Sequence, residues 1–256
     1  MSATTLVRLK RVALTTSLCT ATALGLAACL PTGQDDARPR PTNTGPYADL
    51  SGSDVLNKAV TATKKATSLK IDLEMQTADG KVAAYMAVDT KGDCAGTMSI
   101  GPTGTMEIVR TGDKVYVRSD EAAIRQEVEG ESKEVVDAVL EKMLGKWVES
   151  DMKDPDAATM AEFCDLDTLL SDVEANDNMA KKAGESKVDG VPTLAVTESD
   201  SGVKYTMHVA TKGVPYLVKT QAVGGKEPFT MKFSDFNKPV PARKPPAKDT
   251  VKLDDL

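Results

Sequence analysis

The sequence contains little of the chemistry from which most active sites are built. Among 256 residues there is a single histidine, His208, and aromatic residues make up only 4%. One histidine cannot form the usual zinc sites without paired cysteines, and the sequence has no Gly-x-Ser-x-Gly elbow or phosphate-binding glycine loop. Asp151, Asp154 and Asp156 do not follow the spacing of a calcium loop. The sequence therefore predicts that the protein is not an enzyme and has no catalytic residues, metal or cofactor.

Cysteine is also scarce, and one cysteine follows an apolar segment near the N-terminus. Basic residues stand within the first eleven positions, an apolar run covers residues 12–28, and Leu26-Ala27-Ala28 directly precedes Cys29. This order is typical of a secretory signal that is cleaved before the cysteine. It resembles the lipobox of bacterial lipoproteins. That resemblance implies that residues 1–28 are removed and that Cys29 carries diacylglycerol, usually with a third acyl chain on its amine.

The alternatives are a single transmembrane helix and an ordinary cleaved signal that precedes a cysteine by chance. Thr15, Thr16 and Ser17 interrupt the apolar run, which makes it short and polar for a membrane span. We therefore expect the acyl chains on Cys29 to hold the mature protein at the extracytoplasmic face of the cell membrane.

The remaining cysteines form one pair. Cys19 lies in the predicted signal and Cys29 in the lipidation site, so Cys94 and Cys164 are the only thiols in the exported part. In an oxidising compartment such a pair is expected to form a disulfide. Closing a loop of about 70 residues contributes on the order of 4 kcal/mol in the chain-entropy model, so the bond is predicted to be structural.

Basic residues are fewer than acidic residues. The chain has 32 lysine and arginine residues against 38 aspartate and glutamate residues, and every charged residue in the predicted signal is basic. The exported part is therefore acidic and has no electrostatic footprint for nucleic acid. An acidic body is not attracted to anionic lipid either, which leaves Cys29 as the membrane anchor.

Composition divides the chain into four segments. Residues 1–28 are the predicted signal peptide, and residues 29–52 are the lipidated cysteine and a flexible tether rich in proline, glycine and threonine. Residues 53–237 are expected to fold as one domain. Residues 238–256 are a proline-rich tail, in which the prolines disfavour helix and inner strand.

Hydrophobic periodicity within the expected domain predicts a sheet and several helices. Residues 69–76 alternate strictly between apolar and polar, and five antiparallel strands follow one another up to Ser119. The same reasoning places helices over residues 53–67, 122–128, 133–144, 157–164 and 166–173, and further strands over residues 191–198, 203–210, 215–221 and 229–236. The expected fold is α+β, with a long, twisted antiparallel sheet and a helical layer on one face.

Methionine is common where aromatic residues are few. Six of the eleven methionines fall on strand faces that are expected to point toward the helical layer: Met75, Met86, Met98, Met106, Met207 and Met231. An unbranched methionine adapts its shape, which suits a surface that accommodates flexible acyl chains. The alternative is that these residues fill an ordinary core.

Several short motifs carry a resemblance to a known family. They are Gly112-Asp113-Lys114-Val115-Tyr116-Val117, Gly145-Lys146-Trp147-Val148, Gly190-Val191-Pro192, Val214-Pro215-Tyr216 and Phe233-Ser234-Asp235-Phe236-Asn237-Lys238-Pro239-Val240. With them the chain resembles the actinobacterial LppX/LprAFG-type lipoproteins, from Asp54 to the proline-rich tail. The resemblance implies a LolA-like carrier fold, in which a long curved antiparallel sheet forms a half-barrel and a helical layer lies on its concave face. It also implies an apolar cavity that accepts acylated lipids or glycolipids.

Transferred to this chain, the resemblance implies a ligand-binding cavity between the sheet and the helices. Its floor would consist of Ile71, Leu73, Met75, Met86, Met98, Met106, Ile108, Val115 and Val117, and its roof of Val136, Val139 and Leu140.

Three functions remain open at this point. A lipoprotein that binds or transfers lipid predicts an apolar cavity. An extracytoplasmic interaction module with a protein partner predicts a filled core and an exposed apolar or charged patch. A hydrolase with an unrecognised site predicts a cleft with converging acidic residues.

Overall fold

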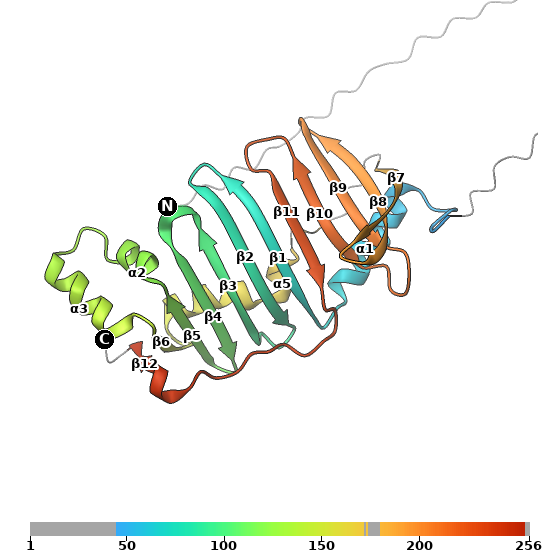
Figure 1. Cartoon of the computed structure of the whole chain (residues 1–256). Coiled ribbons are helices and arrows are strands. Elements are labelled where there is room, and N and C mark those ends of the chain that lie inside the picture. The colour runs from blue at the N-terminus through green and yellow to red at the C-terminus, as the bar shows by residue number, and fades with distance from the viewer. Residues whose placement is uncertain (1–44, 172, 174–179, 254–256) are drawn as a thin grey trace, which may run out of the picture. The chain divides into compact units, whose positions relative to one another are not determined.

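A single sheet organises the part of the chain that the computed structural model describes, which is residues 45–171, 173 and 180–253 (Figure 1). Within these residues the strands are β1 (Ser68–Thr77), β2 (Gly80–Asp89), β3 (Cys94–Ile100), β4 (Thr105–Thr111), β5 (Lys114–Ser119), β6 (Trp147–Asp151), β7 (Lys181–Val188), β8 (Val191–Asp200), β9 (Val203–Ala210), β10 (Leu217–Val223), β11 (Phe229–Ser234) and β12 (Thr250–Lys252). Their order across the sheet is β12-β6-β5-β4-β3-β2-β1-β11-β10-β9-β8-β7. The predicted signal peptide and Cys29 lie outside the described residues.

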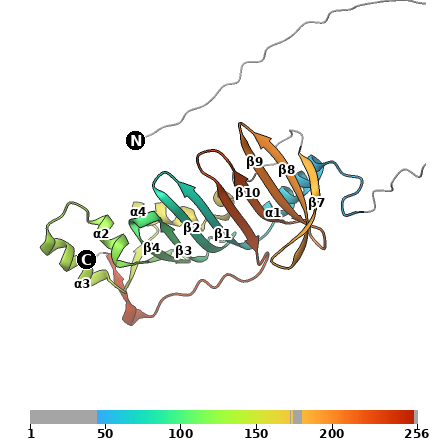
Figure 2. The same cartoon turned by 45° about the horizontal axis from the view of Figure 1, so that its top comes forward.

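Helices cover one face of this sheet, which we call the inner face. The helices are α1 (Gly52–Lys64), α2 (Glu121–Glu127), α3 (Lys133–Met143), α4 (Pro155–Ala161) and α5 (Leu166–Leu169), with short 3-10 turns η1 (Gly101–Thr103), η2 (Glu162–Cys164) and η3 (Ala247–Asp249). Helix α1 contacts β8, β9 and β10, while α4, η2 and α5 lie over the other half of the same face (Figures 1 and 2). An open, curved sheet with a helical layer on one face is the fold that the sequence predicts.

Helices α2 and α3 are not part of this layer. They pack against each other beside β4 and β5 at one end of the sheet (Figure 1). Helix α3 has no buried residue, and its apolar stripe is half-buried at Val136, Val139 and Leu140. The periodicity correctly predicts an amphipathic helix, but a stripe does not specify which neighbour covers it. The structure therefore places these three residues away from the inner face that they were expected to roof.

The predicted run of five antiparallel strands is confirmed as β1 to β5. Ile71 lies opposite Met86 and Leu73 opposite Ala84, and the pairing continues to Gly96 and Met98 on β3. Because side chains alternate along a strand, one register places all these residues on the inner face. The intervening polar residues of β1 point to the opposite, outer face.

Strand β7 forms one edge of the sheet and has no counterpart among the predicted strands. Its sequence, Lys-Lys-Ala-Gly-Glu-Ser-Lys-Val, is exposed along most of its length and shows no apolar alternation. It pairs with β8 through a hairpin at Asp189-Gly190. Lysines on an edge strand discourage pairing with another chain. Because such a strand lacks alternating apolar residues, hydrophobic periodicity does not predict it.

The proline-rich segment expected as a tail is part of the folded structure. Figure 1 shows it running from β11 to the opposite edge of the sheet. On the outer face Ala242 packs against Val109, Tyr116 and Trp147. The segment ends in β12, which pairs in parallel with β6. The sheet is therefore mixed rather than wholly antiparallel, because proline excludes an inner strand but allows an extended segment that ends in an edge strand.

Helix α1 is fixed to the sheet by a buried polar contact as well as by apolar packing. The helix predicted over residues 53–67 is present, but it begins at Gly52 and ends at Lys64, and Ser51 and Asp54 form its capping box. Val55 and Ala59 are fully buried under it. Thr63 is also fully buried, and its hydroxyl accepts a hydrogen bond from the backbone N–H of Leu217 at 2.9 Å. This N–H lies where the register between β9 and β10 shifts.

A motif that carries the family resemblance forms a structural corner after β11. The rings of Tyr216 and Phe236 stack with centroids 3.9 Å apart. Asn237 donates a hydrogen bond to the Tyr216 hydroxyl at 2.7 Å and accepts one from the backbone N–H of Thr67 at 2.7 Å. The motif thus joins the chain after β11 to the end of α1 and the start of β1.

The same corner contains an ion-paired carboxylate. Lys238 donates to the Asp235 carboxylate at 2.6 Å and Lys70 lies 2.7 Å from it. These two ammonium groups, Lys238 before Lys70, lower the pKa of Asp235 from 3.8 to about 2.

We expect Thr63→Val to destabilise the fold by about 1–3 kcal/mol, because it leaves the buried N–H of Leu217 without an acceptor. Urea unfolding of the full chain measures the change. Thr61→Val on the exposed side of the same helix is the matched control and should change the free energy of unfolding by less than about 0.5 kcal/mol. Equal effects of the two substitutions would contradict the role of this hydrogen bond.

We expect Asp235→Asn to lower stability near neutral pH and to have less effect as the pH falls. The folded-state pKa lies below the unfolded value, so the carboxylate contributes stability above pH 4 that is lost between about pH 4 and pH 2. The measurement is the difference in urea midpoint between wild type and variant from pH 7 to pH 2. A difference that stays constant over this range would show that the ion pairs do not stabilise the corner.

Candidate functional site

An apolar hollow lies between the inner face and the layer formed by α4, η2 and α5. It has a volume of about 230 Å³. We call it the methionine hollow, and its lining residues are Ile71, Leu73, Val82, Ala84, Met86, Met98, Met106, Ile108, Met160, Phe163, Leu169 and Met231. None of these twelve side chains is polar. Five of them are methionines, whose flexible thioethers adapt to a variable occupant.

The structure brings together half of the residues proposed from the sequence. Ile71, Leu73, Met86, Met98, Met106 and Ile108 all line the methionine hollow. Val115 is buried in the same core as Ile71 and Ile108 but does not line the hollow, and Val117 packs against that core. Both lie on β5, one strand beyond the lining residues of β4. Alternation identifies the inner face correctly, but it does not define how far the hollow extends across the sheet.

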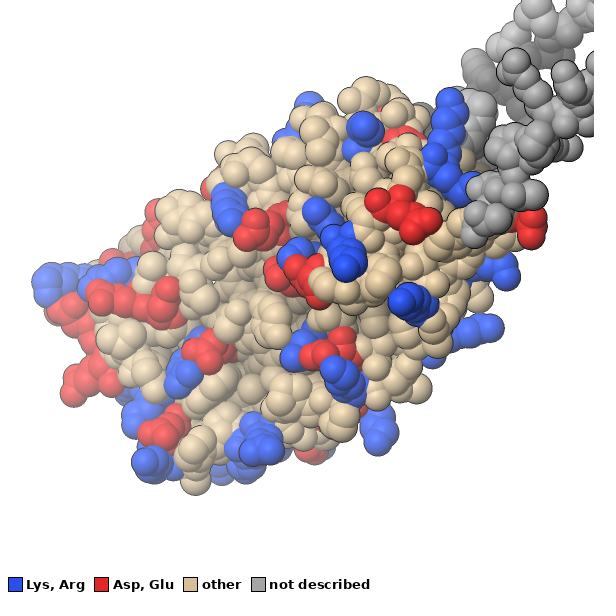
Figure 3. All heavy atoms as spheres, turned by 45° about the vertical axis from the view of Figure 1, so that its right-hand side comes forward, with Lys and Arg blue, Asp and Glu red and all other residues tan. Residues whose placement is uncertain are grey.

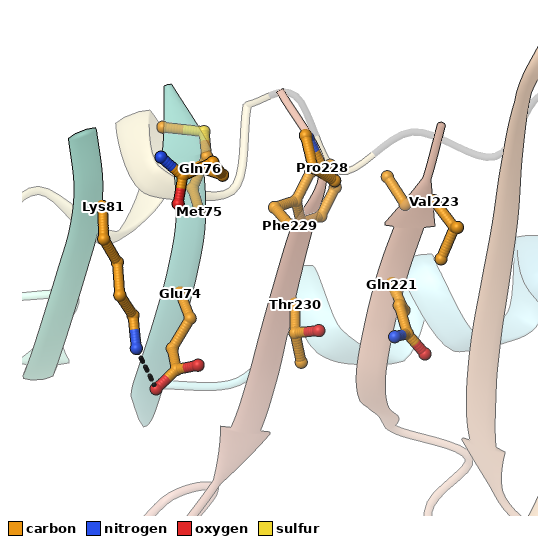
Figure 4. Close-up of a pocket in the computed structure, with 10 residues that line it drawn as sticks. Glu74, Met75, Gln76, Lys81, Gln221, Val223, Pro228, Phe229 and Thr230 are labelled. Atoms are coloured by element: carbon orange, nitrogen blue, oxygen red, sulfur yellow. Dashed lines mark ion pairs between the residues drawn. The ribbon is translucent and has the colours of Figure 1, made fainter. Parts of the chain in front are cut away.

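Met75 lies at a different place, near the ends of β1, β10 and β11. Figure 4 shows it beside a surface hollow together with Phe229, Pro228 and several polar side chains. Lys81 and Glu74 form an ion pair at 3.0 Å in the same region. This hollow mixes charged and apolar groups at the rim of the sheet, so it lacks the dry lining of the methionine hollow.

The roof of the methionine hollow comes from residues that the sequence analysis did not select. Met160 lies on α4, Phe163 on η2 and Leu169 on α5. Phe163 is 39% exposed, which places it at the mouth of the hollow. The neighbouring Cys164 was the available signal, because a cysteine that bonds to the sheet must hold its own segment against it.

The predicted disulfide between Cys94 and Cys164 is present and connects this roof to β3. Both cysteines are fully buried. Gly96 lies two residues after Cys94 on β3 and on the same face. Its cross-strand neighbours are Met86 on β2 and Ile108 on β4. A Cβ atom at Gly96 would stand 2.3 Å from the Met86 sulfur. Glycine therefore gives Met86 room to lie across β3 as part of the floor.

A second hollow adjoins the first under α1. We call it the Glu198 hollow; it has a volume of about 280 Å³ and is lined by Leu56, Val60, Leu169, Val173, Glu198, Tyr205, Met207, Leu217, Thr220, Phe229, Met231 and Phe233. It shares Leu169 and Met231 with the methionine hollow. Most of its lining is apolar, but Glu198, Tyr205 and Thr220 bring polar atoms to it. The inner face thus carries two neighbouring hollows of different polarity.

The outer face has a different character. Figure 3 shows acidic and basic side chains interspersed over the face in view, without a large patch of one sign. Cross-strand ion pairs such as Arg118–Glu107 and Lys114–Asp151 account for part of this mixture. Such a surface gives no basic footprint for nucleic acid.

His208 takes part in a small hydrogen-bond network rather than standing free on the surface. Its Nδ1 lies 3.1 Å from the Ser186 hydroxyl and 3.5 Å from that of Thr193. Burial, followed by the nearby Lys219, lowers the pKa of His208. Among the described residues no carboxylate hydrogen-bonds to His208, so this serine and histidine lack the third member of a catalytic triad.

The side chains and helices of the described ranges also bear on metal binding and on membrane spanning. No group of three or more histidine, cysteine, aspartate or glutamate side chains in them is arranged to hold a metal ion. None of the helices in the same ranges is long and apolar enough to cross a membrane.

Comparison with solved structures relates this fold to known proteins. The chain is similar to LprF from Mycobacterium bovis, with 14% identity, coverage of 76% of this chain and 96% of LprF, and a TM-score of 0.52. It is also similar to the lipoprotein LppX of Mycobacterium tuberculosis, with 14% identity, coverage of 75% and 98%, and a TM-score of 0.46. Comparisons of the sequence with protein-family models and with curated proteins give no match. The chain therefore has the fold of LprF, which confirms the fold that the resemblance of the short motifs implies.

Proposed function

We propose that this protein is an extracytoplasmic lipoprotein that binds or transfers acylated lipids through its inner face. The observation that carries the proposal is the methionine hollow, about 230 Å³ of space with no polar side chain in its lining. Apolar cavities of about 150 Å³ already bind small hydrocarbons. A hollow of this kind favours an acyl chain over a polar or charged ligand, because a polar group placed there would lose its hydrogen bonds to water.

The arrangement of the two hollows supports a ligand longer than one hollow. Ligand sites for small molecules typically enclose about 300–1,000 Å³, and each hollow by itself is smaller than that. Leu169 and Met231 form the boundary between them. Because Met231 is flexible, a change of its rotamer extends one hollow into the other. An acyl chain lying along the inner face then contacts both.

Membrane attachment through Cys29 is the second part of the proposal. The lipobox-like sequence before Cys29 supports it. Acyl chains that insert at about 0.8 kcal/mol per buried methylene group hold such an anchor firmly when two or three are present. The domain then remains close to the membrane from which it takes lipid.

We propose a non-enzymatic role, because among the described residues no hydroxyl group that lines the inner-face hollows hydrogen-bonds to a carboxylate or histidine that could act as its base. The alternative role, an interaction module with a protein partner, requires a filled core on the inner face. The methionine hollow favours the lipid-binding role over this alternative.

The lipid-binding proposal is tested by filling the methionine hollow. Ala84 lines it between Leu73 and Met98, and we expect Ala84→Trp to reduce co-purifying lipid about tenfold or more, which corresponds to about 1.4 kcal/mol of binding free energy. The full chain is purified from a lipid-rich actinobacterial host, and bound lipid is quantified by native mass spectrometry and by organic extraction.

The matched control is Ala83→Trp, which adds the same side chain to the outer face of the same strand between Glu74 and Ser99. It should carry as much lipid as wild type. Ala84→Leu is a milder filling variant for the case in which tryptophan prevents folding. Absence of bound lipid from the wild type, or equal lipid in all variants, would refute a binding site in the methionine hollow.

The anchor is tested separately by metabolic labelling with an alkyne-bearing fatty acid. We expect wild type to incorporate the label and Cys29→Ala to lose it, because the acyl chains are attached to Cys29. Cys19→Ala is the matched control and should label normally, since Cys19 lies in the part that is removed. Label retained in Cys29→Ala would place the modification elsewhere.

A further inference from the structure

The Glu198 hollow contains a carboxylate with one oxygen that lacks a hydrogen-bond partner. Oε2 of Glu198 is buried and has no hydrogen-bond partner among the described residues. Burial is the main cause that raises the pKa of Glu198, and Asp200 adds to it. Buried polar atoms are almost always hydrogen-bonded, because an unpaired one keeps the cost of losing water without compensation. The unpaired oxygen therefore needs an explanation other than stability of the fold.

The groups around Glu198 indicate what kind of ligand could pair with its oxygen. Glu198 lies opposite Tyr205 on β9, and both side chains line the hollow. Thr220 adds a hydroxyl group from the neighbouring β10. Neither the Tyr205 nor the Thr220 hydroxyl hydrogen-bonds to another described residue. The polar atoms of the inner-face hollows thus gather under the β8–β10 half of the sheet, whereas the methionine hollow at the β1–β4 half is dry.

A ligand that matches both halves has one apolar end and one end that donates hydrogen bonds. A carboxylate accepts hydrogen bonds from hydroxyl groups and repels a phosphate, and no cation pairs with Glu198 among the described residues to reverse this preference. The distribution of polar atoms therefore favours an uncharged, hydroxyl-bearing head group.

We propose that Glu198 is a specificity-determining residue that accepts hydrogen bonds from the hydroxyl groups of a lipid head while the acyl chain of that lipid occupies the methionine hollow. This inference rests on the proposed lipid-binding function and names the class of its ligand. It fixes the orientation of the ligand along the inner face. The head group lies against β8–β10 and the end of the acyl chain lies against β1–β4.

The test compares two probes that share one acyl chain. 1-Monopalmitoylglycerol has two free hydroxyl groups, and methyl palmitate has none. Binding of each to the full chain is titrated by native mass spectrometry from detergent. We expect wild type to bind 1-monopalmitoylglycerol at least about tenfold more tightly, as one hydrogen bond to a charged acceptor provides.

The variant Glu198→Met keeps a similar length and removes the acceptor. It should bind the two probes equally and retain wild-type affinity for methyl palmitate. Its urea midpoint should equal or exceed that of wild type, because the buried, unpaired oxygen Oε2 of a half-buried carboxylate is removed. Glu185→Met, at an exposed glutamate of β7, should preserve the preference for 1-monopalmitoylglycerol.

The outcomes separate the inference from the function on which it rests. Equal binding of both probes by wild type would overturn the inference and leave lipid binding intact. An equal loss of both probes in Glu198→Met, or a lower urea midpoint, would assign Glu198 a structural role and also overturn it. Glu198→Gln, which keeps an uncharged acceptor, should show an intermediate preference. Binding of neither probe by wild type would overturn the inference and the proposed function together.

Discussion

The covalent bond between Cys94 and Cys164 is the constraint on which the inner face depends. A sheet as wide as β12 to β7 exposes an apolar face that the chain must cover, and the main contacts of α1 are with β7 to β10. The other half is covered by α4, η2 and α5, each of seven residues or fewer. Elements this short are marginal as independent helices. The disulfide adds a covalent link to the packing of their buried residues, among them Ala161, Leu166 and Leu170.

Local sequence predicts the strands in which apolar and polar residues alternate regularly. Strand β1 alternates so regularly that its inner residues are identifiable from the sequence. Its pairing with β2 follows from the turn signal Asp79-Gly80, which coincides with the two-residue turn Ala78-Asp79. Strand β7 has no such pattern because most of its side chains face solvent. The contact of the proline-rich segment with Tyr116 and Trp147 joins residues about a hundred positions apart. Nothing in the local sequence of either partner encodes that contact.

The same distinction explains how much of the candidate site could be predicted. The floor follows from alternation, since Met86, Met98 and Met106 lie on the inner faces of the consecutive strands β2, β3 and β4. The choice of roof depends on which helix returns to the inner face. Helix α3 has the stronger amphipathic pattern, yet η2 provides Phe163 because Cys164 is bonded to β3. The covalent constraint therefore decides the roof, and an apolar stripe alone does not reveal it.

The free-energy cost of the methionine hollow can be compared with the stabilisation that the disulfide contributes. An enclosed apolar cavity costs about 24 cal/mol per Å³. Because the methionine hollow opens beside Phe163, about 5 kcal/mol is an upper bound on the packing free energy that its volume of about 230 Å³ withholds from the fold. Closing the loop between Cys94 and Cys164, 70 residues apart, contributes about 4 kcal/mol in the chain-entropy model. The two amounts are similar. A protein selected only for stability would fill this space with larger side chains, whereas this chain keeps the space and fastens its roof with a covalent bond. That combination is the one expected of a cavity maintained for an occupant, because burial of an acyl chain recovers the packing that the empty hollow lacks.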